Sequence, residues 1–231
     1  MRLGVIGGMG VFAGLKFVQI VSEGSISINE TEGVDIILDN TTSTPSRTRH
    51  VLYDEKSPVQ SIIQRCKQLE KLHIDLIAIP CNSACCFLHE IKKSVDTEIL
   101  DIISLTVHSV IKYRDQIKNP LILSGRVPYS LSVYHDKFQS HGLKAVSLLE
   151  KEQLSVESII STLKTMSMNV KIMHEYHRLI SYLKSRYEFD AVILGCTEFS
   201  LLSEEDIGVP TFDSNQILAK EVIKIHESSR S

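Results

Sequence analysis

Short apolar runs alternate along this chain with longer stretches in which apolar residues recur at helical spacing. The runs lack polar alternation, which is typical of parallel strands that are covered on both faces. They predict strands at 2–6, 34–38, 75–79, 99–102, 120–124, 144–147, 190–194 and 210–213. The stretches between them predict helices at about 13–27, 58–72, 83–93, 104–115, 128–141, 154–186 (one or two helices) and 215–228. Such alternation predicts an α/β fold with parallel sheets.

Two of the predicted strands end in nearly the same way. Residues 75–83 and 190–198 each contain an acid, a short apolar run, a helix-permissive breaker, a cysteine and then small polar residues. The offset from the acid to the cysteine is the same in both segments, which places Cys81 and Cys196 in equivalent positions. This similarity predicts two pseudosymmetric α/β domains with the active site in the cleft between them.

The position of the two cysteines predicts reactive thiols. Each follows the carboxyl end of a parallel strand, where sites in α/β proteins lie, and precedes a predicted helix. The positive end of a helix favours a thiolate over a thiol. Cys81 and Cys196 would thus present two sulfurs to opposite faces of one small molecule. The competing interpretation is two unrelated buried cysteines, since free Cys is usually buried and inert.

A glycine-rich turn follows the first predicted strand. Residues 8–13 fit the G-x-G-x-x-A pattern of dinucleotide-binding turns. The acid that this pattern requires should end the second strand, whereas we place Asp39 in a polar loop after it. We favour a turn, containing Met9 and Gly10, whose backbone N–H groups approach a small carboxylate. A nucleotide-dependent oxidoreductase is the alternative.

The polar segment 39–50 is rich in hydroxyl groups and long for a simple connection. Long loops in compact α/β domains are often functional. The segment contains Asn40 and Arg47, and the planar guanidinium of Arg47 is suited to binding a substrate carboxylate. A solvated loop arginine is the alternative interpretation.

Composition and charge narrow the class of function. The chain of 231 residues carries 25 Lys and Arg against 28 Asp and Glu, so it lacks the basic character of nucleic-acid-binding proteins. No apolar stretch approaches the roughly 20 residues needed to span a bilayer, and no signal peptide is evident. We therefore expect a cytoplasmic protein whose five cysteines are reduced thiols and which binds neither nucleic acid nor membrane.

A metal site is a second possibility for the first cysteine. Cys81, Cys85 and His89 recur every fourth residue and would share one helix face. Structural zinc sites usually have four ligands in tight pairs, and the sequence has no C-x-x-C. We therefore expect no metal.

Several motifs together resemble the aspartate/glutamate racemase family over nearly the whole chain. These are Gly7-Gly8-Met9-Gly10, Pro80-Cys81-Asn82-Ser83-Ala84 and Leu194-Gly195-Cys196-Thr197-Glu198, supported by Pro45-Ser46-Arg47-Thr48 and Asp213-Ser214. The two cysteine motifs are the specific ones. The family consists of cofactor-independent amino-acid racemases. The resemblance implies two domains, which we place at 1–98 with 212–231 and at 99–211, and commonly a homodimer.

The resemblance also implies a two-base mechanism without a cofactor. Cys81 and Cys196 would be the catalytic pair: one, as thiolate, removes the α-proton while the other, as thiol, delivers a proton to the opposite face. Arg47 and Lys164 would bind substrate carboxylate. The full set of residues expected to contact the amino-acid substrate is Met9, Gly10, Asn40, Arg47, Asn82, Ser83, Lys164, Thr197 and Glu198.

Three positions depart from the family pattern. Cys85 replaces a histidine, residues 124–129 replace a Thr-rich turn that normally helps to hold substrate, and Val11-Phe12 replaces proline and a small polar residue. Both proposed proton carriers are retained. We therefore predict a racemase of aspartate or glutamate. The alternatives are a racemase or isomerase of another small acid, and a carboxylate-binding protein without turnover.

Overall fold

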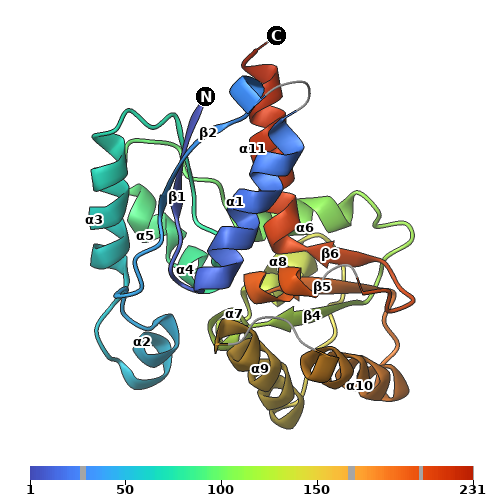
Figure 1. The fold of residues 1–231 in the computed structure, drawn as a ribbon. Coiled ribbons are helices and arrows are strands. Elements are labelled where there is room, and N and C mark those ends of the chain that lie inside the picture. Colours follow the sequence, from blue (N-terminus) through green and yellow to red (C-terminus); the bar gives the residue numbers. More distant parts are fainter. Residues whose placement is uncertain (27–29, 166–169, 203–204, 231) are drawn as a thin grey trace.

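The first half of the chain forms a three-stranded parallel sheet. The structure, a computed structural model, describes residues 1–26, 30–165, 170–202 and 205–230 (Figure 1). Strand β1 (Arg2–Ile6) lies between β2 (Asp35–Asp39) and β3 (Leu76–Ala78), and both pairings are parallel. The glycine turn and the first cysteine turn therefore leave the same edge of this sheet from adjacent strands.

The second half repeats this arrangement. Strand β5 (Ala191–Gly195) lies between β4 (Pro120–Ser124) and β6 (Thr211–Asp213), again in parallel. Every residue of β4 and β5 is buried. The two parallel sheets confirm the predicted α/β fold, and complete burial explains why these strands are uninterrupted apolar runs.

Helices cover the sheets, and their bounds differ in places from the sequence-based expectation. The first half contributes α1 (Val11–Ser25), η1 (Glu30–Glu32), α2 (Arg47–Tyr53), α3 (Val59–Glu70), α4 (Asn82–Cys85), α5 (Leu88–Lys92) and α6 (Ile102–Ile111). The second contributes α7 (Arg126–Ser130), α8 (Val133–Ser140), α9 (Glu150–Thr165), α10 (Val170–Arg186), η2 (Thr197–Leu201) and α11 (Ser214–Ser228).

Alternate residues of the central strand β5 pack against helices on opposite faces of the second sheet. Val192 and Leu194 belong to the apolar cluster formed with α9 and α10. Ile193, between them, belongs to the cluster that contains Phe138 of α8 and extends into the first half. One apolar cluster therefore spans both halves, and a second one lies between the second sheet and helices α9 and α10.

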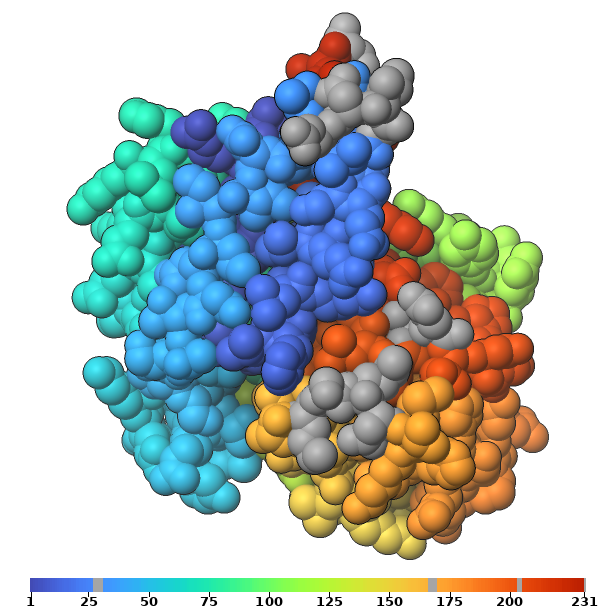
Figure 2. Space-filling model, in the orientation of Figure 1, coloured from blue at the N-terminus to red at the C-terminus, as the bar shows by residue number. Residues whose placement is uncertain are grey.

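Helices α6 and α11 tie the two halves together. Asp101 caps α6 by accepting hydrogen bonds from the backbone of Ile103, and Asp213 caps α11 in the same way through Asn215. Helix α11 packs along α1 of the first half and against α6, while α6 also contacts α8. Figure 2 shows the blue surface of α1 lying directly against the red and orange surface of the second half.

Several predicted elements were wrong in extent. The strands expected at 99–102 and 144–147 are reduced to single parallel bridges, Ile77 to Ile99 and Leu121 to Val146. At the first of these, the cap formed by Asp101 starts a helix at the next residue. The helix expected over 128–141 is divided into α7 and α8 because Ser132 has a left-handed backbone, with φ of 51°.

Two more differences concern the cysteine and arginine segments. The helix expected at 83–93 is two short helices, α4 and α5, with Phe87 between them at φ −102° and ψ 12°. The segment 39–50, expected to be a loop, ends in helix α2, because the Ser46 hydroxyl caps it by accepting from the Arg49 backbone at 3.2 Å. Residues 166–169, within the helical stretch expected at 154–186, lie outside the described residues.

The predicted domain boundaries stay a prediction. Strand β6, which contains residue 212, pairs with β5 of the second sheet, whereas α11 packs along α1. Across the described ranges, no helix has the length and apolar character that crossing a bilayer requires.

Candidate active site

Most of the predicted site residues line one small cavity between the two halves. Its volume is about 70 Å³. The predicted residues at its wall are Met9, Arg47, Cys81, Asn82, Ser83, Lys164, Cys196, Thr197 and Glu198. Ser46 and Thr48 also line it, although we did not single them out; their place beside Arg47 in the Pro45 to Thr48 motif was the available signal.

Two predicted residues, Gly10 and Asn40, are not part of the cavity wall. Gly10 lies against the carboxylate of Glu198, so closely that a Cβ atom there would come within 2.2 Å of Oε1. The buried Oδ1 atom of Asn40 lies against Gly7, where a Cβ would approach it to 2.7 Å. Gly10 therefore lies behind a side chain of the cavity wall, and Asn40 lies against the start of the glycine turn.

The first cysteine turn is fixed by its asparagine. Asn82 is 2 % exposed; its Nδ2 donates to Ser214 Oγ at 3.0 Å and its Oδ1 accepts from the Tyr134 hydroxyl at 2.6 Å. Ser214 in turn donates to the Leu194 carbonyl at 2.8 Å. The residue after Cys81 is thereby bonded, through one hydroxyl, to the strand that precedes Cys196.

The second cysteine turn makes the reciprocal contact. The Thr197 hydroxyl donates to the carbonyl oxygen of Pro80 at 3.0 Å, directly before Cys81. Both cysteines have extended backbones, with φ and ψ of −155° and 104° at Cys81 and −137° and 127° at Cys196. The turns are therefore alike in conformation, and each is hydrogen-bonded to the other half.

The two thiols have different partners. Cys81 Sγ lies 3.8 Å from the carbonyl oxygen of Met9. Cys196 Sγ donates to Glu198 Oε2 at 2.8 Å. Burial, together with the negative charge of Glu198, raises the pKa of Cys196 well above its usual value, although the positive charge of Lys164 opposes this.

For Cys196, the expectation that its position would favour a thiolate was wrong. The helices that follow the two cysteines are α4, four residues long, and the 3-10 helix η2, five residues long. Such short helices contribute little dipole field. At Cys196, burial and the adjacent Glu198 carboxylate raise the thiol pKa by more than this helix can lower it.

Two cationic side chains reach the cavity from different elements. Arg47, at the start of α2, donates from Nη2 to the Met9 carbonyl at 3.0 Å and from Nη1 to that of Pro45 at 3.2 Å. Lys164, near the end of α9, lies with Nζ 3.8 Å from Glu198 Oε1. Partial burial, with the side chain still 42 % exposed, lowers the pKa of Lys164, but the negative charge of Glu198 raises it and the net direction is upward.

An arginine that we did not single out holds the loop of Arg47 in place. Arg65 is 6 % exposed, and its guanidinium donates to Thr44 Oγ1 at 2.8 Å, Gly7 O at 2.9 Å and Asp39 Oδ2 at 2.6 Å. It therefore joins the ends of β1 and β2 to the polar segment. Its position on the apolar face of α3 was the only signal in the sequence.

The placement of Asp39 in a loop was wrong, because this residue ends β2. Its carboxylate accepts hydrogen bonds from Arg65 and from the backbone of Thr41 at 3.0 Å. Although burial opposes the effect, these contacts lower the pKa of Asp39. In a dinucleotide-binding protein, the acid at the end of the second strand binds a ribose hydroxyl. Here Asp39 at that position is hydrogen-bonded to Arg65 and Thr41 instead.

Metal ligation has no geometric support in the part of the chain that the structure describes. No group of three or more His, Cys, Asp and Glu side chains there is placed to hold a metal ion. Cys85, proposed as a ligand beside Cys81, is 5 % exposed, and its thiol contacts the carbonyl oxygen of Ile79 at 3.5 Å.

Comparison with known proteins identifies the family. Residues 6–222 match the family model described as Asp/Glu/hydantoin racemase. The chain belongs to this family. Its structure is similar to the aspartate racemase of Picrophilus torridus, with a TM-score of 0.87 and 28% identity over 98% of this chain and 94% of that one.

Two further relatives have lower sequence identity to this chain. The glutamate racemase of Campylobacter jejuni subsp. jejuni has a TM-score of 0.70 and 20% identity, covering 97% of this chain and 86% of its own, which supports the fold alone. The broad specificity amino-acid racemase RacX of Bacillus subtilis (strain 168) is 23% identical over 184 residues, 79% of this chain and 78% of that protein.

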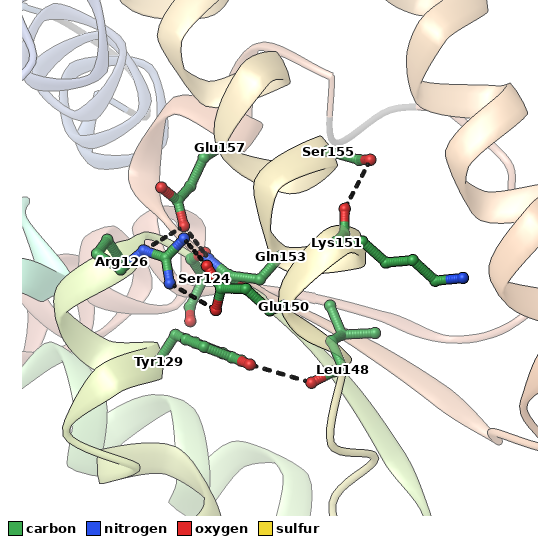
Figure 3. Close-up of polar contacts among 9 residues, drawn as sticks. All are labelled: Ser124, Arg126, Tyr129, Leu148, Glu150, Lys151, Gln153, Ser155 and Glu157. Carbon is green, nitrogen blue, oxygen red and sulfur yellow. Dashed lines mark hydrogen bonds and ion pairs between the residues drawn. The ribbon is translucent and has the colours of Figure 1, made fainter.

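Residues 124–129 depart from the family's sequence pattern. In the structure, the side chains of this turn contact helix α9 and the segment before it. Arg126 is directed to α9, where its guanidinium bonds Glu150 at 2.8 Å and 3.0 Å and Glu157 at 2.8 Å (Figure 3). The Tyr129 hydroxyl donates to the carbonyl of Leu148 at 3.1 Å. These side chains bind α9 and the segment before it.

Gly125 is the member of this turn that lies next to the cavity. A Cβ atom at this position would lie 3.6 Å from Ser83 Oγ and 3.8 Å from Cys196 Sγ, in ordinary van der Waals contact. Its φ of −69° is accessible to any residue. The glycine therefore leaves unfilled space beside the sulfur of Cys196.

Proposed function

We propose that this protein is a racemase of an acidic amino acid, aspartate or glutamate, and that Cys81 and Cys196 are its two proton carriers. The observation that carries the proposal is the joint presence of both sulfurs on the wall of one small cavity, each presented by an equivalent turn from a different half. Arg47 and Lys164 supply positive charge at the same cavity. Two cationic groups suit a substrate with two carboxylates better than a neutral amino acid.

The chemistry needs two acid–base groups on opposite faces of one carbon. The thiolate of one cysteine takes the α-proton, so that a C–H bond breaks and an S–H bond forms. Negative charge then grows on the substrate carboxylate, where nearby cations and hydrogen-bond donors stabilise it. The S–H of the other cysteine delivers its proton to the opposite face of the carbon, which inverts the configuration.

The proposed mechanism needs no cofactor, because both proton carriers are side chains of this chain. Arg47 and Lys164 would bind the carboxylates, and Asn82 and Thr197 would hold the two turns at a fixed separation through their hydrogen bonds across the halves. A homodimer and a cytoplasmic location stay predictions that follow from the resemblance and the composition.

The direct test is exchange of the α-proton in deuterated water, followed by NMR, on both enantiomers of aspartate and glutamate. We expect exchange at the wild-type protein, and loss of racemisation in Cys81→Ala and in Cys196→Ala. Cys86→Ala is the matched control, because Cys86 lies only five residues after Cys81 but is not at the cavity wall. Absence of exchange on all four substrates, with folded protein, would contradict the proposal.

The panel should also contain neutral amino acids of increasing size. The space that Gly125 leaves beside Cys196 is the specific observation that favours a broader substrate range. Faster exchange on a neutral amino acid than on aspartate or glutamate would support the racemase reaction but would show that the substrate is not an acidic amino acid.

A further inference from the structure

The two thiols at the cavity are equally accessible but differently bonded. Cys81 is 6 % exposed and Cys196 is 8 % exposed, so solvent access does not distinguish them. Cys196 makes a 2.8 Å hydrogen bond to a carboxylate, whereas the contact of Cys81 is a long one, 3.8 Å, to a neutral carbonyl oxygen. A difference in reactivity between them would therefore come from bonding and charge.

The pseudosymmetry of the halves identifies the origin of this difference. The second residue after Cys81 is Ser83, and the second residue after Cys196 is Glu198. Glu198, in the second cysteine turn, thus corresponds to the small neutral residue Ser83 in the first.

The carboxylate of Glu198 is buried, with Oε2 hydrogen-bonded to Cys196 and Oε1 without a hydrogen bond from any described residue. Its side chain is 3 % exposed, and Gly10 allows Oε1 to lie where a Cβ atom would otherwise be. Oε2 faces Cys196 Sγ, and Lys164 Nζ lies 3.8 Å from Oε1. A buried carboxylate in this position is a strong acceptor for a thiol proton.

We propose that Glu198 keeps the proton on Cys196 in the resting enzyme, so that Cys81 is the sulfur that starts a turnover as the base. The assignment rests on the proposed racemase function. The substrate enantiomer whose α-proton faces Cys81 then meets a base on one side and a ready acid, Cys196, on the other.

The opposite enantiomer requires a proton to move before reaction. The S–H bond of Cys196 breaks and its proton passes along the existing hydrogen bond to Glu198 Oε2, forming an O–H bond. The Cys81 thiolate takes up one proton from the bulk solvent to form its S–H bond, so that the site binds one additional proton in this state. No electrons are exchanged in this step. Glu198 therefore has two roles. In the resting enzyme it stabilises the proton on Cys196, and when the roles of the cysteines reverse it accepts that proton.

The other charged groups near Cys196 do not cancel this effect. Lys164, from α9, opposes Glu198, but its side chain is 42 % exposed and its 3.8 Å ion pair is screened by water. A negative charge on Cys81 adds to the effect of Glu198, since it further disfavours a thiolate at Cys196. Arg47 faces the same cavity; its positive charge is of the same sign as that of Lys164 and disfavours the charged form of Lys164.

The experiment measures the alkylation rate of each cysteine separately. Wild type and Glu198→Gln are treated with iodoacetamide between about pH 6 and about pH 10, and modified peptides are quantified by mass spectrometry. In wild type we expect Cys81 to be alkylated faster than Cys196. In Glu198→Gln we expect the Cys196 rate at a fixed pH to rise by about tenfold, since one unit of pKa changes the thiolate fraction by about that factor.

Two further variants separate charge from packing. Glu198→Asp retains the charge and should keep Cys196 closer to wild type than Glu198→Gln does. Glu150→Gln removes the same charge at an exposed position away from the cavity, and should leave both alkylation rates unchanged. Thermal unfolding of each variant shows that the rates refer to folded protein.

The outcomes also distinguish this proposal from the racemase function. Alkylation of Cys196 as fast as that of Cys81 in wild type, or a Cys196 rate unaffected by Glu198→Gln, would overturn the proton assignment, even if α-proton exchange is observed. Unequal alkylation that depends on Glu198, with no exchange on any amino acid, would overturn racemisation and leave the resting proton position intact.

Discussion

The two cysteine turns share a backbone conformation and differ in the chemistry two residues later. Each turn follows a buried parallel strand, and each is bonded to the opposite half by the residue after the cysteine. The first continues with Ser83 and the second with Glu198, which contacts its cysteine at 2.8 Å. Pseudosymmetry thus places the two sulfurs in equivalent positions, while a single side-chain difference gives them different hydrogen-bond partners.

The largest expected effect concerns the bonds that join the turns. Asn82→Ala removes two buried hydrogen bonds and leaves the Tyr134 hydroxyl without its acceptor, so we expect a loss of about 3 kcal/mol in the free energy of unfolding. Thr197→Val removes one bond and should cost about 1 kcal/mol. Denaturant unfolding measures both, with Thr162→Val on α9 as the control. Equal losses would show that the first turn is not the more firmly held.

The next effect separates the position of Glu198 from its charge. Gly10→Ala places a Cβ atom 2.2 Å from Oε1 and must displace the carboxylate, while the extended backbone of Gly10 tolerates alanine. We expect racemisation to slow by about 100-fold, since small misplacements at an active site have effects of that order. Alkylation of Cys196 should rise at the same time.

Gly125→Ala is the matched substitution on the other side of Cys196. Its added Cβ makes only contacts of 3.6 Å and 3.8 Å, so we expect a smaller change in racemisation rate. If Gly125→Ala slowed the reaction as much as Gly10→Ala, the special importance of the Glu198 position would be refuted.

A third change makes the two turns alike. Ser83→Glu adds a carboxylate in the first turn of α4, at the position equivalent to Glu198. Negative charge beside a thiol disfavours the thiolate, so we expect alkylation of Cys81 to fall by about tenfold. Peptide-resolved alkylation measures this, with Cys196 as the internal reference. An unchanged Cys81 rate would mean that the residue two positions after the cysteine does not control the thiol.

The smallest effect is expected at Lys164. Lys164→Met removes a positive charge that opposes Glu198, so the pKa of Cys196 should rise further and its alkylation at a fixed pH should slow. Because the side chain of Lys164 is 42 % exposed, solvent screens its charge, and we expect the change in rate to be at most about fivefold. Faster alkylation of Cys196 in this variant would contradict the assigned direction.

The parts of the molecule that periodicity controls could be predicted from the sequence. The apolar runs of β4 and β5 report burial on both faces, and the equal spacing before Cys81 and Cys196 reports two equivalent turns. Because parallel strands end at the same edge of a sheet, the glycine turn after β1 and the Cys81 turn after β3 could be placed near one another. Cys81 and Cys196 follow strands of different sheets, so their meeting was predicted from the similarity of the two turns and from the family resemblance.

The remaining features depend on which side chains meet in three dimensions. The position of Arg65 on an apolar helix face does not reveal that it bonds Gly7 and Asp39, distant in the sequence. The contact between Gly10 and Glu198 is equally invisible to spacing. The pKa of Cys196 is raised by burial and by the charge of Glu198, which is why a rule based on helix ends alone gave the wrong direction.

The pairing of α1 with α11 has a consequence for how the chain folds. The side chain of Asn215 donates to the carbonyl of Ala13 at 3.2 Å across 202 positions of sequence. During synthesis, α1 leaves the ribosome long before the segment that covers it, so its apolar face must wait for a contact of very high sequence separation. Such contacts slow folding because a large loop must close before they form.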